Sequence, residues 1–133
     1  MKRTILHLIN FALILAFMIT ICVVEDRIVK TSLEKVEEYC YEIEALAYDA
    51  TDLRTRELAL LVDNLAYEWK IDESNMCFLV DHKSVQEIGT EIVRLKNYIT
   101  ENEIIEFKIS LELIRNYTHT YLHFMGASWH NVL

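Results

Sequence analysis

The chain has 133 residues, enough for one small domain, and 53% of them are hydrophobic while 26% are charged, which excludes a disordered chain. It holds no Pro and two Gly, so the turn residues of a β-sandwich or barrel are nearly missing. The clustered glycines of a phosphate-binding loop are missing too, which excludes nucleotide enzymes built on such loops. We therefore expect an all-α protein.

The first expected element is a transmembrane helix. Residues 4–24 carry no formal charge and would form a helix of about 31 Å, against a hydrocarbon core of about 30 Å. Two basic residues precede the segment and two acidic residues follow it, so the positive-inside rule places the N-terminus in the cytoplasm. A cleaved signal peptide would need a shorter apolar region and small residues before the cut. The expected organisation is a cytoplasmic tip and signal anchor over 1–24, a juxtamembrane continuation over 25–30 and an extracytoplasmic helical domain over 31–133.

The expected outer domain is strongly acidic. Two of the 13 basic residues precede the span and all 21 acidic residues follow it, so 11 basic and 21 acidic side chains give the outer part a charge of −10. Such a surface repels phosphate backbones and anionic headgroups, so nucleic acid is not an expected partner. Solubility is the simplest reason for this charge.

Apolar residues spaced by three and four predict the helices of the outer domain. The first stripe extends back through Ile28 and Val29, so we expect the membrane helix to continue outside the bilayer without a break. The second helix is expected to begin near Asp52, a candidate N-cap. The two stripes are Leu33, Val36, Cys40, Ile43 and Ala47, and then Leu58, Leu61, Val62, Leu65, Trp69, Met76, Leu79 and Val80.

Two more helices are expected after these. Ser84 and Glu87 match a capping box that would begin the third helix, and Asn102 or Thr100 is expected to cap the fourth. The broad apolar face of the last helix predicts contact with two neighbours. Short connections favour an antiparallel bundle of about four helices. The stripes are Val85, Ile88, Ile92, Leu95 and Ile99, and then Phe107, Leu111, Ile114, Thr118, Tyr121 and Met125.

Two features of these helices leave alternatives open. Gly89 lies beside the third stripe, where it either lets two helices approach closely or is a tolerated weak point in the helix. Cys40 and Cys77 lie outside the membrane span, where an oxidising environment permits a disulfide. Two cysteines make no disulfide framework, so buried thiols are the alternative.

Candidate chemistry is confined to two histidine patterns. His119 and His123 share one helix face and could reach a common metal ion, but no third ligand is evident, and a solvated polar face is the alternative. Asp81 and His82 are expected at the end of the second helix, where they either anchor the turn or form half of a general acid–base system. No Ser or Cys nucleophile is placed by spacing to complete such a system. The sequence therefore predicts no enzyme and no cofactor.

The second half of the chain resembles a known family. Trp69, the segment 78–82, the segment 92–99 and the terminal 131–133 are similar to the domain of unknown function 4363 family. These are short bacterial proteins with one N-terminal membrane helix and a helical outer part. The resemblance implies that architecture and no reaction or ligand. The positions that it marks for attention are Trp69, Asp81, His82, Arg94, Tyr98 and Asn131.

The expected function is a non-enzymatic interaction module held at the outer face of the cytoplasmic membrane. Its expected partner is a membrane or envelope protein, bound through exposed apolar surface. The alternative is a metal or small-ligand sensor that uses surface groups such as His119, His123, His82 or Glu112. A hydrolase using Asp81 and His82 is a third hypothesis. The oligomeric state stays open.

Overall fold

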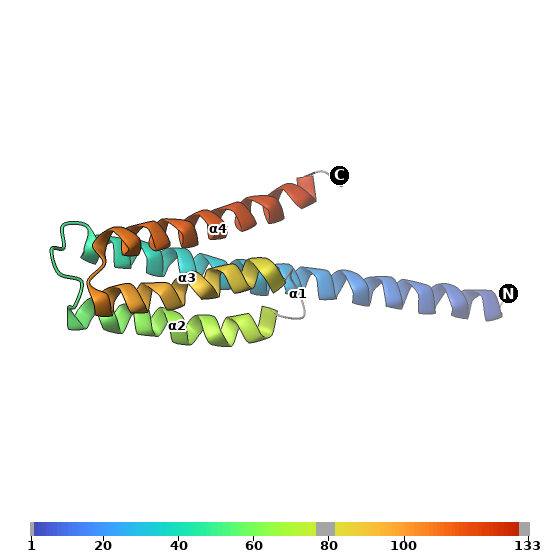
Figure 1. Cartoon of the computed structure of the whole chain (residues 1–133). Helices are drawn as coiled ribbons and strands as arrows, with labels where there is room; N and C mark the ends of the chain where they lie inside the picture. The colour runs from blue at the N-terminus through green and yellow to red at the C-terminus, as the bar shows by residue number, and fades with distance from the viewer. Residues whose placement is uncertain (1, 77–81, 131–133) are drawn as a thin grey trace.

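The computed structural model describes residues 2–76 and 82–130, and this part of the chain holds four helices and no strand. The prediction of an all-α fold is therefore confirmed (Figure 1). The helices are α1 (Lys2–Ala47), α2 (Arg56–Met76), α3 (His82–Glu101) and α4 (Ile104–His130).

The four helices form an antiparallel bundle. α1 packs against α2 and α4, and α3 packs against the same two helices, so α4 has the two neighbours that its broad apolar face predicted. The α1–α2 connection (48–55) and the α3–α4 turn (102–103) lie at the end of the bundle away from the N-terminus, which we call the distal end (Figure 1). Towards the other end, α4 diverges from its neighbours (Figure 1).

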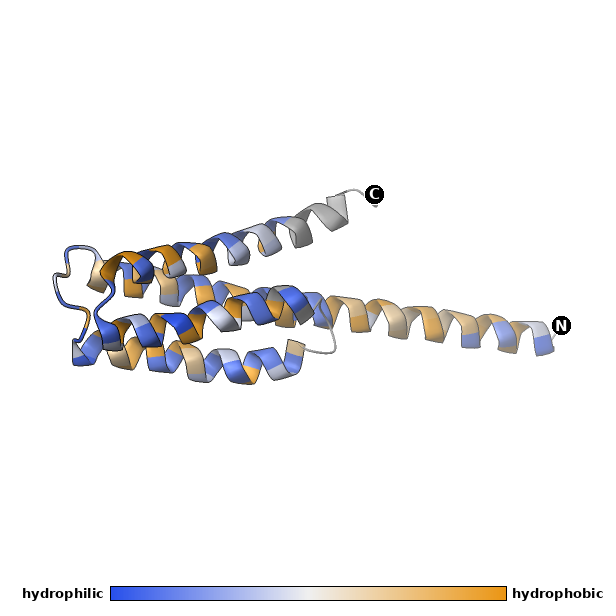
Figure 2. Cartoon of the chain, viewed as in Figure 1, coloured by the Kyte–Doolittle hydropathy of each residue, from blue (hydrophilic) through white to orange (hydrophobic). Residues whose placement is uncertain are grey.

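α1 is a single unbroken helix of 46 residues, as the backward extension of its stripe predicted. Its N-terminal half projects from the bundle and is apolar (Figure 2), and burial begins at Val29, which is 2% exposed. By length and composition this helix can cross a membrane, and none of its most apolar window is buried in the bundle. A signal sequence near an N-terminus has the same length and composition.

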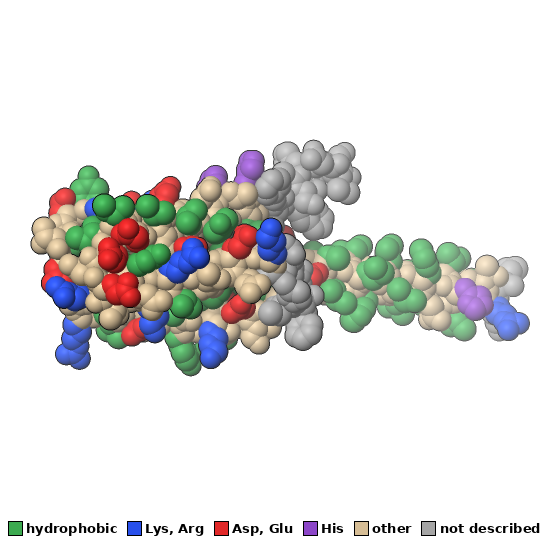
Figure 3. All heavy atoms as spheres, in the orientation of Figure 1, with side chains coloured by type: hydrophobic (Ala, Val, Ile, Leu, Met, Phe, Trp, Pro, Cys, Tyr) green, Lys and Arg blue, Asp and Glu red, His purple; other side chains and the backbone are tan. Residues whose placement is uncertain are grey.

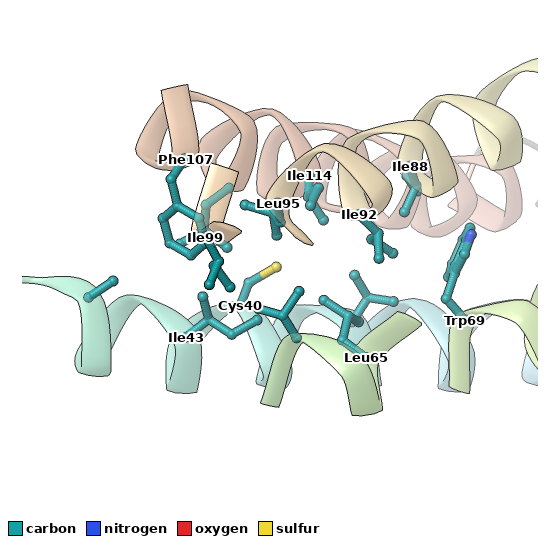
Figure 4. Packing of buried hydrophobic residues seen from close by; sticks show 14 of the residues in the cluster. Cys40, Ile43, Leu65, Trp69, Ile88, Ile92, Leu95, Ile99, Phe107 and Ile114 are labelled. Atoms are coloured by element: carbon teal, nitrogen blue, oxygen red, sulfur yellow. The ribbon is translucent and has the colours of Figure 1, made fainter. Parts of the chain in front are cut away.

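The core consists of the predicted stripes facing one another (Figure 4). Cys40 and Ile43 of α1 and Leu95 of α3 are fully buried, and nearly all other stripe positions in the described residues are buried as well. Leu61 and Tyr121 are partly buried against this core. Leu79, Val80 and Met125 lie outside the residues whose side chains are described.

The expected start of the second helix at Asp52 is wrong. α2 begins at Arg56, and Thr55 caps it by accepting a hydrogen bond from the N–H of Leu58 at 3.3 Å. The Asp52 carboxylate instead accepts hydrogen bonds from the backbone and side chain of Arg54, both at 2.9 Å. A helix begun at Asp52 would turn Leu53 away from the apolar stripe, whereas the non-helical backbone lets Leu53 become fully buried.

The expected capping box at Ser84 is also wrong. α3 begins at His82, so Ser84 lies inside the helix and His82 is in its first turn, not in the last turn of α2. Glu87, instead of reaching back to cap a helix end, has its carboxylate 3.9 Å from the ammonium of Lys83 one turn earlier. Such pairs stabilise a helix only weakly, but they favour continuing it through this point.

Neither Asn102 nor Thr100, the two residues expected to cap the start of α4, does so. Asn102 has a φ of 59° and ends α3 in a Schellman motif, in which the N–H of Glu103 donates to the carbonyl of Tyr98 at 2.9 Å. The Thr100 hydroxyl donates to the carbonyl of Lys96 in its own helix. Asn tolerates the left-handed conformation better than other residues with a Cβ, so it suits the helix end more than the helix start.

Candidate functional site

The positions marked by the family resemblance do not form one cleft among the described residues. Trp69 lies in α2, whereas Arg94 and Tyr98 lie one turn apart in α3. Asp81 and Asn131 lie outside the described residues, and of His82 only the backbone, at the start of α3, is described. Among the described positions, each has its own local contacts, and their roles as functional residues stay predictions.

Trp69 packs against Gly89 across the α2–α3 interface. Its indole rises from α2 towards α3 near Ile88 (Figure 4) and is 3% exposed. A Cβ placed on Gly89 would lie 3.0 Å from the indole Nε1, which is closer than side chains normally pack. The structure thus decides between the two readings of Gly89: its missing side chain makes room for the indole. The buried Nε1–H has no hydrogen-bond partner in the described part of the protein.

A buried carboxylate joins α3 to α4. Glu91 is 6% exposed, and its Oε2 accepts a 2.6 Å hydrogen bond from the hydroxyl of the buried Ser110. Arg94 donates to its other oxygen at 2.6 Å. A charge this deep requires such partners, because leaving it unpaired would cost several kcal/mol, about 3–5. Glu91 was not among the residues predicted from the sequence, although it lies on the third stripe, three residues after Ile88.

A second cluster joins α1 to α4 near the distal end. The Arg115 guanidinium lies 2.9 Å from the Glu44 carboxylate and stacks over the Tyr41 ring, 4.9 Å from its centroid. Beside it is a hollow of about 220 Å³ lined by both acidic and basic side chains. Lys108 donates to the carbonyl of Tyr48 just beyond the end of α1, where a cation is favourable. Sequence spacing gives no signal for this cluster, since its members are far apart along the chain.

His119 and His123 lie in α4, and both are exposed. Their rings are parallel within 9°, with centroids 6.5 Å apart, so the predicted common face is real. No group of three candidate metal ligands occurs in the described part of the chain. The pair offers two imidazole ligands for a metal, fewer than a zinc site uses.

Cys40 carries a free thiol at the centre of the bundle. It is fully buried, and this desolvation raises the pKa of the thiol to about 12. A thiol with that pKa is inert near neutral pH. Cys77, the other member of the suggested disulfide, lies outside the described residues.

Several large apolar side chains remain exposed at the distal end. We call these five residues the distal apolar set: Leu46 (40% exposed), Tyr48 (71%), Leu60 (59%), Ile105 (69%) and Ile109 (57%). They come from the end of α1 and the starts of α2 and α4, and hydrophobic side chains along α4 are visible in Figure 3. Large apolar side chains left exposed at one end of a bundle are candidates for contact with another protein.

Comparison with known proteins adds a family. No curated protein and no solved structure matches the chain. The family model described as "Domain of unknown function (DUF4363)" matches residues 23–132, which include the bundle part of α1 as well as α2, α3 and α4. This match extends the resemblance seen in the sequence back to the end of the apolar segment, and the chain belongs to this family.

Proposed function

We propose that this chain is a single-pass membrane protein whose bundle stands on the outer face of the cytoplasmic membrane and binds a membrane or envelope protein without catalysing a reaction. The observation that carries this proposal is the continuity of α1. The most apolar stretch of its N-terminal part is not buried among the described residues, whereas its second part forms one wall of the bundle core. An exposed apolar helix of this length is stable in a bilayer but not in water.

The charges flanking the apolar segment support the proposed orientation. Lys2 and Arg3 precede it, and Glu25 and Asp26 follow it. Basic residues are retained on the cytoplasmic side, which puts the bundle outside. The acidic outer domain is also repelled by anionic headgroups, so the bundle would stand away from the bilayer surface.

The geometry favours a protein partner over the lipid surface. Ala47 follows Val24 by 23 residues on one helix, which corresponds to a rise of about 35 Å. The distal apolar set would therefore lie roughly that far from the outer leaflet, beyond the reach of lipid. A surface held at that height suits a partner in the envelope or the outer domain of another membrane protein.

The orientation is tested with a single accessible cysteine. Thr90 is exposed on α3, so Thr90→Cys is introduced with Cys22 and Cys77 changed to Ser and the buried Cys40 kept. We expect a membrane-impermeant thiol reagent to label Cys at 90 in intact cells. The matched control with Thr90 unchanged should stay unlabelled. Labelling that appears only after lysis would contradict the proposed orientation.

The partner is sought by crosslinking in native membranes. A photoreactive amino acid is placed at Leu60 or Ile105, two positions of the distal apolar set, and at Gln86 on the outer surface of α3 as a control. We expect a specific crosslinked protein from the distal positions and none from the control. Replacing residues 1–24 by an unrelated anchor separates recognition by the bundle from recognition inside the bilayer. No crosslink from either distal position would contradict the proposed function.

The alternative function, a metal or small-ligand sensor, is supported by the parallel and exposed rings of His119 and His123. Zinc or copper is titrated into the full-length protein in detergent, with His119→Ala as the control. A metal that binds the folded state at 100 times its Kd stabilises it by about 2.7 kcal/mol, which raises Tm. An unchanged Tm up to millimolar metal would remove this alternative.

A further inference from the structure

We propose that the groove between α1 and α2 is the docking site for a basic amphipathic helix of the partner protein. This inference rests on the proposed function and names the surface and the chemistry of the partner. It is carried by three properties of the groove: its length, its apolar part and its uncompensated negative charge.

The groove consists of two adjoining hollows along the two helices. Two hollows, of about 270 Å³ and 380 Å³, lie between α1 and α2, and Glu42 lines both of them. Along α1 the lining extends from Lys35 to Leu46, which corresponds to about 16 Å or three helical turns. A docked helix of three or four turns would match this length.

The distal part of the groove is apolar. Leu46 and Leu60 are 40% and 59% exposed, and Ala45 and Leu61 line the same hollow. Helix-in-groove recognition uses apolar side chains at i, i+3, i+4 and i+7 that enter such a hollow. Both leucines belong to the distal apolar set, so the groove joins the surface proposed to bind the partner.

The charge lining the groove is negative and largely unpaired. Glu38, Glu42 and Glu57 line it and make no ion pair with the described residues. The one basic residue of the lining, Lys35, already lies 3.7 Å from Glu68 and 3.8 Å from Asp72. The lining therefore has no other basic side chain to pair with Glu38, Glu42 and Glu57, and a basic partner would supply one.

The pKa of Tyr39 reflects the negative charge of the groove. Its hydroxyl donates a 3.1 Å hydrogen bond to Glu68. Partial burial, this hydrogen bond and the nearby carboxylates of Glu42 and Glu38 together raise the pKa of Tyr39. The carboxylates thus act together on one point of the groove instead of being dispersed over the surface.

Other hollows between helices do not share this imbalance. The α1–α4 hollow is lined by two acidic and two basic side chains, and the α2–α3 hollow by two lysines and one glutamate. The acidity of the α1–α2 groove is therefore local and not just the net charge of the domain. Opposite charges across an interface increase the association rate and exclude wrong partners, so the structure assigns this groove to a basic partner. Its acidity excludes anionic lipid as the occupant.

The test uses the full-length protein in nanodiscs of neutral lipid and two designed helical peptides of about 15 residues. Both peptides carry the same leucine ridge, flanked by Lys in one and by Glu in the other. Binding is measured by fluorescence anisotropy, with empty nanodiscs subtracted. We expect the Lys peptide to bind at least tenfold more tightly than the Glu peptide, with an affinity that falls as salt rises. Equal binding of the two peptides, or no binding of either, would overturn the proposal.

Variants locate the binding. Leu46→Gln with Leu60→Gln should weaken the Lys peptide at least tenfold, whereas Val93→Gln on α3, at an apolar side chain that is 58% exposed, should leave it unchanged. Glu42→Lys with Glu57→Lys should reverse the preference in favour of the Glu peptide, a gain that misfolding cannot produce. Binding that is indifferent to the groove variants, or that is lost in Val93→Gln, would overturn the proposal.

Crosslinking in cells separates the failure of this inference from the failure of the proposed function. A partner crosslinked from Leu60 supports the groove. A partner crosslinked from Ile105 and not from Leu60 keeps the proposed function and overturns the groove. No partner from either position overturns both.

Discussion

The backbone N–H of Leu53 donates a 2.7 Å hydrogen bond to Oδ1 of Asn102, 49 residues further along the chain. The bond ties the α1–α2 connection to the α3–α4 turn, so one residue closes both connections at the distal end. Asn102 can do this because it combines a left-handed backbone, with a φ of 59°, and a side-chain acceptor. This contact lies at the same end of the bundle as the distal apolar set.

Substitutions of Asn102 should separate its two roles. Asn102→Asp keeps both and should change the free energy of unfolding by less than about 0.5 kcal/mol. Asn102→Gly keeps the backbone conformation but leaves the N–H of Leu53 without its acceptor, which costs about 1–2 kcal/mol. Asn102→Ala loses both and should cost about 2–4 kcal/mol. Denaturant unfolding of the full-length variants in detergent, followed by circular dichroism, measures the order. If the Asn102→Gly variant were as stable as the unchanged protein, the hydrogen bond from Leu53 to the Asn102 side chain would contribute nothing to stability.

Gly89 and Trp69 should be energetically coupled. Ala is favoured over Gly inside a helix by about 1 kcal/mol, but a Cβ at position 89 would lie 3.0 Å from the indole nitrogen. We therefore expect Gly89→Ala to destabilise the protein by about 1 kcal/mol when Trp69 is present and to stabilise it by about 0.5–1 kcal/mol in a Trp69→Phe background. The four variants form a double-mutant cycle measured by thermal unfolding. Equal stabilisation in both backgrounds would show that Gly89 is only a weak point in the helix.

The buried hydroxyl of Ser110 should contribute more to the free energy of unfolding than an exposed hydroxyl does. Ser110→Ala leaves one oxygen of the buried Glu91 carboxylate without its 2.6 Å donor, so a loss of about 1–3 kcal/mol is expected. Thr90→Ala is the matched control, because that exposed hydroxyl bonds only to the carbonyl of Gln86 in its own helix. The control should change stability by less than about 0.5 kcal/mol. Similar losses in the two variants, measured by denaturant unfolding, would contradict the role of Ser110.

Cys40 should make the protein sensitive to alkali. Burial raises the pKa of its thiol from 9.0 to about 12 in the folded state, so the folded chain holds a proton that the unfolded chain releases above about pH 9. The stability from this group is complete below pH 9 and is lost as the pH rises towards 12. Between pH 9 and pH 10 the native protein should lose about 1 kcal/mol more than Cys40→Ala. Parallel pH curves for the two proteins in denaturant unfolding would contradict the burial of an ionisable thiol.

The positions of the helix ends show where sequence patterns stop being sufficient. Local caps were expected at Asp52, Ser84 and Asn102, yet Thr55 caps α2, α3 begins at His82 and Asn102 ends a helix. A cap contributes about 1 kcal/mol, so several candidate residues compete within a few positions. Burying Leu53 outweighs that difference, and which leucine is buried depends on contacts with a distant part of the chain.

The sequence predicts one property of the candidate binding surface and not the other. Its acidic composition follows from counting charges, but the groove needs Glu42 of α1 and Glu57 of α2 to lie along the same hollow. Helical spacing relates residues within one helix and says nothing about which face of a neighbour they meet. Glu91 lies outside this groove, and its place among the apolar positions of α3 was a signal of burial already visible in the sequence.

The sequence by itself determined the all-α fold, the unbroken α1 with its exposed apolar half, and nearly every core position. These follow from periodicity and hydrophobicity, which are properties of local stretches of chain. Only the tertiary structure shows the hydrogen bond between Leu53 and Asn102 and the close packing of Trp69 on Gly89. The same holds for the ion pair of Arg115 with Glu44 and for the acidic groove between α1 and α2. Each of these depends on side chains that become neighbours when antiparallel helices pack, at a register that is set by the sum of many contacts in the core.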